Sequence, residues 1–216
     1  MSKSHFVEGL DAVQAEVHSV LKPLGFQKKG RTHNRLTIGG LTHVINFQRD
    51  KWVEERIMFP WIWKKSYGKF AINIGVLLPC VYQAECQTSP PPFVQDYECT
   101  IRQRLGRLAF DRDEWFTVTD DGTGLAKSLI DLLHRFGFDF LNQFQTYENV
   151  LLHYRKHDKL PDQNSGRASL EAAIISHHLG DAVSARSLLQ KAYATNHKGF
   201  QGHVAEIADR LGITLA

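Results

Sequence analysis

The spacing of apolar residues changes twice along this chain, and this change limits the folds that the chain can adopt. Residues 6–24 place apolar side chains three and four positions apart, which predicts an amphipathic helix. Residues 32–48 alternate between apolar and polar, and residues 69–78 are almost continuously apolar, as strands are. From residue 125 the helical spacing returns. A helix, then strands, then further helices predict an α+β protein.

Short turn sequences between the strands predict an antiparallel sheet. Gly39-Gly40 separates two alternating segments, as hairpin turns do. We expect the apolar segment 69–78 to be a central strand, and shorter strands at 99–108 and 114–119. A run of three prolines predicts an extended loop over 83–97. The N-terminal helix is expected to cover one face of this sheet.

The change of pattern near residue 124 predicts two regions. Residues 1–124 are expected to form the sheet domain, and residues 125–216 a helical region that packs on it. Within the helical region, small and apolar residues flank a glycine turn at the offsets of a helical hairpin. This hairpin resembles a single tetratricopeptide repeat. The residues that carry the resemblance are Ala173, Gly180, Ala185, Leu189 and Ala192.

Composition excludes several classes of protein. A hydrophobic fraction of 43% and a charged fraction of 23% are typical of a globular chain. No apolar run reaches the roughly 18 residues of a membrane-spanning helix, and the first eight residues lack the apolar stretch of a signal peptide. An odd number of cysteines, three, favours free thiols in a reducing compartment. We therefore expect a cytoplasmic protein.

Four amide side chains interrupt the predicted strands. A buried amide costs free energy unless its hydrogen bonds are met, so each needs a local reason to be there. One interpretation is a polar ligand pocket that the amides share with arginines. The other is that the amides bond to edge or bulge backbone. The candidate pocket residues are Asn34, Arg35, Asn46, Gln48, Asn73, Arg102 and Arg104.

Arg102 and Arg104 are two positions apart, so in a strand they share one face. Their guanidinium groups suit a carboxylate or a phosphate in two-point contact. The acidic residues Asp111, Asp113 and Glu114 offer them internal salt bridges instead.

Residues 51–68 combine aromatic and basic side chains, a composition that suits a binding surface. Exposed tryptophans anchor protein interfaces. Residues 1–70 also hold 12 Lys and Arg against 6 Asp and Glu, which leaves nucleic acid as an alternative partner. The candidate partner-binding residues are Trp52, Trp61, Trp63, Lys64 and Lys65.

Motifs of the common enzyme classes are absent from the sequence. It has no GxSxG, GxxxxGK[ST], GxGxxG or HExxH pattern. His153 and His157 are four apart on a predicted helix with Glu148 before them, but the sequence fixes no third ligand. We therefore expect no metal and no cofactor, and we favour a non-catalytic protein over an enzyme.

Five short motifs follow one another between residues 6 and 119. They are Gly25-Phe26 with Lys28 and Gly30, Asn34-Arg35, Asn46-Phe47-Gln48, Phe70 to Val76, and Arg102 to Gly106 followed by Trp115. Their order and spacing resemble a bacterial domain-of-unknown-function family. The resemblance implies an α+β fold in a cytoplasmic bacterial protein and brings no catalytic residues.

These observations lead to three hypotheses of function. The first is a protein-binding module, such as an immunity protein that neutralises a bacterial toxin by occlusion; this rests on analogy with small proteins of similar families. The second is a ligand-binding protein or an enzyme that uses the amide and arginine pocket. The third is a nucleic-acid-binding protein that uses the basic N-terminal third.

Overall fold

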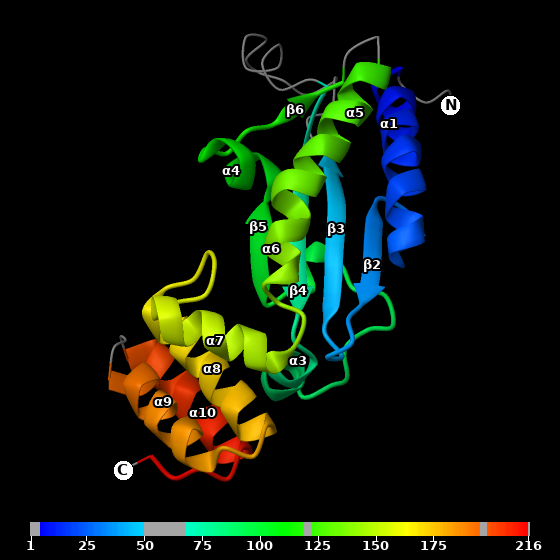
Figure 1. The fold of residues 1–216 in the computed structure, drawn as a ribbon. Helices are drawn as coiled ribbons and strands as arrows, with labels where there is room; N and C mark the ends of the chain where they lie inside the picture. The colour runs from blue at the N-terminus through cyan, green and yellow to red at the C-terminus, as the bar shows by residue number, and fades with distance from the viewer. Residues whose placement is uncertain (1–4, 50–67, 119–121, 195–197, 216) are drawn as a thin grey trace, which may run out of the picture. The chain divides into compact units, whose positions relative to one another are not determined.

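The computed structural model describes residues 5–49, 68–118, 122–194 and 198–215. Its strands form one open antiparallel sheet in the order β1-β2-β3-β4-β5, with β6 also paired to β4 (Figure 1). This architecture confirms the predicted α+β class. The strands are β1 (Gln27–Lys29), β2 (Thr32–Leu36), β3 (Thr42–Arg49), β4 (Lys69–Leu77), β5 (Ile101–Arg104) and β6 (Phe116–Thr117).

The centre and the edge of the sheet differ in burial, as their sequences predict. Every residue of β4 after Lys69 is buried, so this strand is covered on both faces. All three residues of the edge strand β1 are exposed, and two of them are Lys28 and Lys29. Lysines on an edge strand discourage pairing with a further chain. Part of the basic N-terminal third therefore has a structural explanation.

One face of the sheet is covered by helices. Helix α1 (His5–Leu21) continues into the 3-10 turn η1 (Lys22–Leu24) and packs with α5 (Gly122–Leu132) (Figure 1). Gln14 of α1 donates to the carbonyl oxygen of Gly30 at 3.1 Å, and Arg31 pairs with Asp11 at 2.8 Å. The apolar stripe of α1 is buried, as its spacing predicts: Leu10, Val13, Val17 and Leu21.

A π-helical turn, η3 (Leu133–Gly137), joins α5 to α6 (Phe138–Asn142). Here the helix and strand β4 come unusually close. A Cβ atom on Gly137 would lie 3.1 Å from Cδ1 of Ile74 and 3.0 Å from Cδ2 of Leu133, so these side chains would have to shift for a larger residue to fit. The glycine therefore allows the close approach of this turn to β4.

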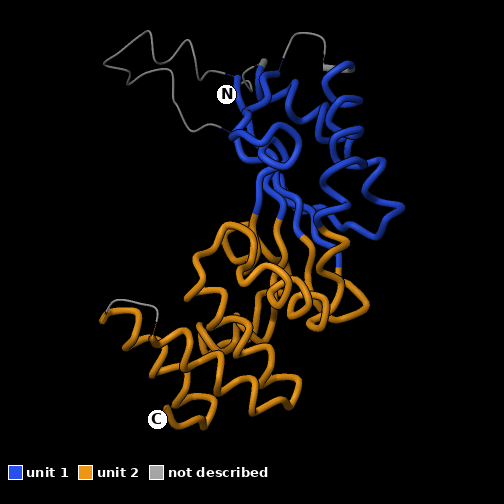
Figure 2. The backbone as a smooth tube through the Cα atoms, turned by 60° about the vertical axis from the view of Figure 1, so that its left-hand side comes forward, with its two compact units in different colours: residues 1–35, 44–74, 103–140 blue, residues 36–43, 75–102, 141–216 orange. Residues whose placement is uncertain are grey.

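The chain forms two compact units (Figure 2). Strands β3, β4 and β5 each contribute residues to both units. Helix α5 belongs to unit 1, although the sequence predicts that the helical region begins at residue 125. The division into residues 1–124 and 125–216 stays a prediction. Unit 1 is residues 1–35, 44–74 and 103–140; unit 2 is residues 36–43, 75–102 and 141–216.

Unit 2 contains a set of helices around α8. Helix α8 packs against α3, α7 and α9, and α10 packs against α9. Every residue from Gly166 to Ser176 except Arg167 is buried, so α8 is the core of this unit. Gly180 (φ 82°) makes the turn into α9. The helices are α3 (Pro79–Cys86), α7 (Tyr147–His157), α8 (Ser165–His178), α9 (Ala182–Ala194) and α10 (Lys198–Arg210).

Two local predictions are wrong in the structure. Residues 83–97 are not a loop throughout, because α3 extends to Cys86 and a 3-10 turn, η2, spans Asp96–Glu98. Pro79 occupies the first turn of α3, where its fixed φ suits a helix. The strand predicted at 99–108 ends at Arg104, and helix α4 (Leu105–Phe110) follows it.

Candidate functional site

The amide residues predicted to line a pocket meet one another across three strands. Asn73 of β4 donates to Oε1 of Gln48 at 2.9 Å and to Oδ1 of Asn46 at 3.4 Å. Asn46 in turn donates to Oγ1 of Thr32 on β2 at 2.9 Å. We call these four residues the amide ladder.

The amide ladder makes its hydrogen bonds within the sheet, as a structural role requires, although these bonds join side chains and not the edge or bulge backbone groups that were expected. Asn73 is 6% exposed, so its amide group would be costly to bury without a partner. Both of its partners lie on the neighbouring strand β3. Asn34 of β2 is also largely buried and has interactions of its own.

The three predicted pocket arginines are likewise engaged. Arg35 lies over the ring of Phe26 at 4.8 Å, and burial lowers the pKa of its guanidinium. Arg102 pairs with Asp96 at 3.2 Å. The alternative prediction, that Arg102 and Arg104 form internal salt bridges, is confirmed, but the partner of Arg102 differs from those expected.

Arg104 has two partners within unit 1. It pairs with Asp113, one of the acidic residues that the sequence offers, and lies over the ring of Trp115 at 5.0 Å. The hydrogen bond from Arg104 holds the pKa of the Asp113 carboxyl below its usual range. Among the other predicted acidic partners, Glu114 pairs with Arg112 at 2.8 Å.

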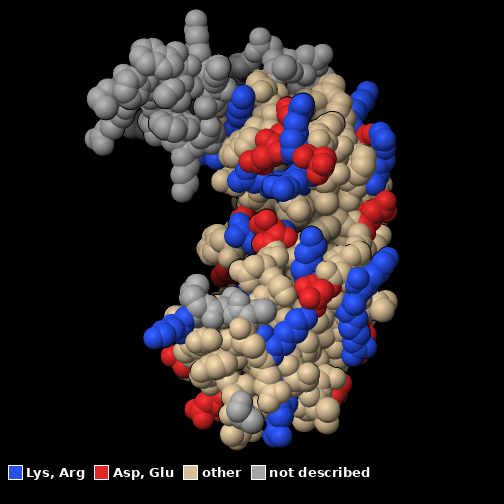
Figure 3. All heavy atoms as spheres, turned by 90° about the vertical axis from the view of Figure 1, so that its left-hand side faces the viewer, with Lys and Arg blue, Asp and Glu red and all other residues tan. Residues whose placement is uncertain are grey.

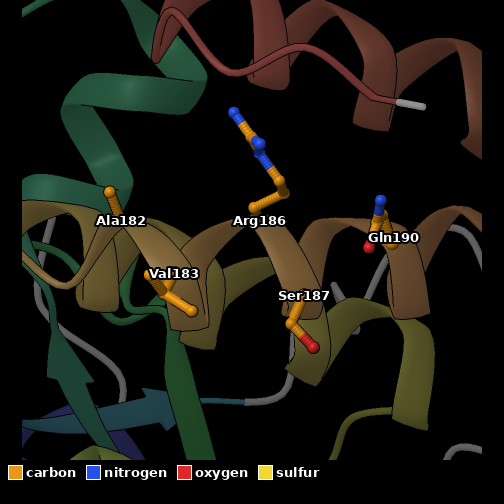
Figure 4. A pocket seen from close by; sticks show the side chains of 5 residues that line it. All are labelled: Ala182, Val183, Arg186, Ser187 and Gln190. Atoms are coloured by element: carbon orange, nitrogen blue, oxygen red, sulfur yellow. The ribbon is translucent and has the colours of Figure 1, made fainter.

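Helix α9 presents a different surface, which the sequence analysis did not single out. Five of its residues line an open hollow with a volume of about 430 Å³ (Figure 4). Arg186 and Gln190 project on one side of this face, and Val183 and Ser187 on the other. The residues that line the hollow are Ala182, Val183, Arg186, Ser187 and Gln190. We call this surface the α9 outer face.

The α9 outer face combines an exposed apolar side chain with an unmatched charge. Val183 is 83% exposed, and among the large apolar residues that the structure describes only Ile38 of the β2–β3 hairpin is more exposed. Arg186 has no hydrogen bond or ion pair with any residue that the structure describes. Helix α9 contains no Asp or Glu, so no carboxylate lies one turn away along the helix.

The lack of an Asp or Glu near Arg186 can be recognised in the sequence, and it could have identified this surface. Positions 182, 183, 189 and 190 are the helical neighbours of Arg186, and all are uncharged. The sequence analysis used α9 only for its inward-facing residues, and these are buried as expected: Ala185, Leu189 and Ala192.

The comparisons with known proteins identify part of the chain. A family model described as Domain of unknown function (DUF4304) matches residues 17–143. The chain belongs to the DUF4304 family. Comparison with curated proteins and with solved structures gave no match. The match includes the amide ladder and Arg104, and it ends before α9.

Two cysteine thiols, both inside the DUF4304 match, are held in their protonated form. Burial raises the pKa of Cys80 to about 12, and it raises that of Cys99 still further. A nucleophilic cysteine needs a lowered pKa. These two thiols therefore lack the activation that covalent catalysis requires.

The histidine pair considered for metal binding lies just beyond the DUF4304 match. The rings of His153 and His157 are 4.6 Å apart on α7. Burial, and then the neighbouring His157, lower the pKa of His153. Among the residues that the structure describes, no three or more His, Cys, Asp and Glu side chains gather as a metal site would require.

The C-terminal helices contain a buried charged cluster. Glu171 of α8 is 1% exposed, and its two oxygens accept from Nε of Arg167 and Nε2 of Gln163, both at 2.8 Å. Arg167 also pairs with Glu85 of α3 at 3.0 Å, and Glu85 lies 3.0 Å from Nε2 of His203 on α10. Burial raises the pKa of Glu171 to about 7. The cluster joins three helices of unit 2.

The predicted partner-binding residues Trp52, Trp61, Trp63, Lys64 and Lys65 lie outside the residues that the structure describes. On the face of the molecule shown in Figure 3, basic and acidic side chains are interspersed. That face therefore lacks the one-sided basic patch typical of a nucleic-acid interface. None of the described helices has both the length and the apolar character of a membrane span.

Proposed function

We propose that this DUF4304 protein is a non-catalytic protein-binding module of the bacterial cytoplasm, and that the α9 outer face is part of its binding surface. The observation that carries this proposal is the exposure of Val183 beside the hollow. Protein interfaces combine apolar contact area with polar groups that form hydrogen bonds, and the α9 outer face offers both around one hollow. The tryptophan-rich segment 51–68 is a second candidate surface of the same module.

The alternatives have less support. A ligand pocket built on the amide ladder would have to break hydrogen bonds that Asn73 already makes. A nucleic-acid interface would need several free cations, whereas Arg31, Arg35 and Arg104 have partners within unit 1. The resemblance of the α8–α9 hairpin to a tetratricopeptide unit also favours a protein partner, because helical repeats present such surfaces.

The finer proposal is that the partner is a bacterial toxin, which the chain neutralises by covering its active site. Occlusion requires shape and exposed contact residues and no catalytic group on the inhibitor. It is consistent with two cysteines that are not activated and with arginines that are paired. A partner that is toxic alone and harmless when expressed with this chain would support it.

The experiment is a pull-down of the tagged full chain from its native cell, with the captured proteins identified by mass spectrometry. Val183→Asp tests the α9 outer face, because it places a desolvation cost in an apolar contact. The substitution should not harm the helix, since Val183 lies in the first turn, where a carboxylate is favourable. Leu152→Asp is the matched control, because Leu152 is also exposed but lies on α7.

We expect one stoichiometric protein that Val183→Asp loses and Leu152→Asp retains. If the captured protein is lost only when Trp61 and Trp63 both become alanine, the binding surface is the segment 51–68 and not the α9 outer face. Capture that none of these variants changes, or no stoichiometric protein at all, would contradict the proposal.

A further inference from the structure

The charge of α9 is the starting point for a statement about the partner. The helix carries two cations, Arg186 and Lys191, and no anion. Lys191 is engaged, because it donates to Asp158 and lies near the hydroxyl of Tyr154 at 3.3 Å. Arg186 thus remains as a positive group that no described residue of the chain neutralises.

The neighbours of Arg186 narrow the kind of group that can bind there. Val183 precedes it by three positions and Gln190 follows it by four, so both are its neighbours along the helix. Gln190 projects on the same side of the α9 outer face as Arg186, and Val183 projects on the other side (Figure 4). Val183 offers apolar area, and the Gln190 amide can donate and accept hydrogen bonds. A guanidinium group beside an exposed apolar side chain suits a carboxylate that is carried next to an apolar residue.

We propose that the α9 outer face binds an acidic amphipathic segment of a partner protein. One carboxylate of this segment pairs with Arg186, and an apolar side chain three or four positions away packs on Val183. This inference rests on the proposed protein-binding function and names its partner class. The geometry is that of a helix laid along a helix, in which apolar contacts and one charge pair set the register.

Charge favours an acidic protein segment over two other occupants of the α9 outer face, which are a second copy of this chain and nucleic acid. In a symmetric pair of copies of this chain, the α9 outer faces would bring two cations toward each other, which disfavours self-association. Nucleic acid takes its affinity from several phosphate contacts, and the hollow offers one guanidinium beside a valine. An acidic protein segment satisfies both groups.

The test is selection of random 16-residue peptides, displayed on phage, against the immobilised full chain. We expect the enriched peptides to share an Asp or Glu three or four positions from a large apolar residue. A synthetic peptide of this sequence should bind the Arg186→Glu variant about 10- to 100-fold more weakly than the wild type. Lys127→Glu is the control, because Lys127 is exposed on α5 and its replacement changes the net charge equally.

The peptide itself supplies a second comparison. Exchange of its acidic residue for the neutral amide should weaken binding to the wild type by a similar factor and should not weaken binding to Arg186→Gln further. Such non-additivity would locate the carboxylate at Arg186. Thermal unfolding of each variant confirms that its fold is intact.

Several outcomes would overturn the inference. Peptides that Val183→Asp loses but Arg186→Glu retains would leave protein binding in place and exclude an acidic partner. Peptides that bind both variants as well as the wild type would remove the α9 outer face from the proposed function too. Failure to enrich any peptide would contradict an acidic protein segment as the partner. So would a dimer of this chain that Val183→Asp dissociates, or binding of a single-stranded DNA oligonucleotide that requires Arg186.

Discussion

Arg104 and Arg186 are the same residue type in two regions with opposite surroundings. Arg104 lies in the DUF4304 match, where Asp113 neutralises it and Trp115 covers it. Arg186 lies beyond the match on α9, where no described residue pairs with it. The sequence analysis singled out the first as a ligand-binding residue and passed over the second. Residue type alone therefore does not mark a binding site. A binding residue also needs a charge or hydrogen-bonding group that the rest of the fold has not already paired.

The same contrast predicts what substitutions do. Where polar groups are matched with one another, their removal should cost folding stability. Where they are unmatched, as on the α9 outer face, their removal should cost binding and leave stability unchanged.

The largest stability effect is expected in the buried cluster of unit 2. The pKa of Glu171 is raised from 4.5 to about 7, so the folded chain keeps a proton that the unfolded chain has released between these pH values. This contribution to stability is fully present below pH 4.5 and is lost as the pH rises through about 7. It corresponds to roughly 3 kcal/mol.

Glu171→Gln removes the titrating group while keeping an acceptor for Arg167 or Gln163. The free energy of unfolding of the wild type should therefore fall relative to this variant by roughly 3 kcal/mol as the pH is raised from 4.5 to 8. Urea unfolding of the wild type and of Glu171→Gln at several pH values measures this difference in the free energy of unfolding. Arg167, Glu85 and His203 also belong to the cluster, so His203→Gln serves as a control that changes the cluster while keeping Glu171. If the free energy of unfolding had the same pH dependence in the wild type and in Glu171→Gln, the raised pKa of Glu171 would be contradicted.

A smaller loss is expected from the amide ladder. Asn73→Leu leaves the acceptor oxygens of Gln48 and Asn46 without their donor, which should lower the free energy of unfolding by about 1–3 kcal/mol. Chemical denaturation measures this, and Gln48→Leu, at the exposed end of the ladder, should cost less. If Asn73→Leu instead left stability unchanged and abolished binding of a partner or ligand, the sheet would be the functional site and the comparison would fail.

The smallest effects separate the two arginines themselves. Arg104→Ala should destabilise the chain by about 0.5–1 kcal/mol, since its ion pair is largely solvent-exposed and its ring contact adds little more. Arg186→Ala should change the unfolding free energy by less than about 0.5 kcal/mol, because it removes no contact within the described chain. Differential denaturation of both variants under one condition tests the contrast. A larger loss for Arg186→Ala would show that its side chain has a structural partner.

The sequence predicted the fold class and most elements because periodicity reports directly on burial. The stripe of α1 and the apolar run of β4 are examples. It failed where a local rule was overridden. The run of prolines after residue 89 predicts an extended loop, whereas Pro79 begins helix α3, which extends to Cys86. The strand predicted at 99–108 ends at Arg104 and is followed by α4, in which Gly106 lies so close to the carbonyl oxygen of Glu114 that a Cβ atom would be 2.3 Å from it. Alternation along the sequence does not report this tertiary contact.

The site was harder to predict than the fold. The amides of the sheet are recognisable as unusual residues, but only the structure shows that Asn73 reaches both Gln48 and Asn46. Arg186 is an ordinary residue by type, and its significance is that none of the residues placed in the structure pairs with its charge. Pairing of charges across elements depends on tertiary contacts, which a single sequence does not contain.

The most direct test of the central claim is photo-crosslinking in the native cell, with a benzophenone amino acid placed at position 183 or at position 152. Both positions are exposed, one on α9 and the other on α7. A binding surface on the α9 outer face predicts one discrete adduct from position 183 and none from position 152. Adduct formation should decrease when Arg186→Glu is added. The absence of an adduct from position 183, or the same set of adducts from both positions, would contradict the account.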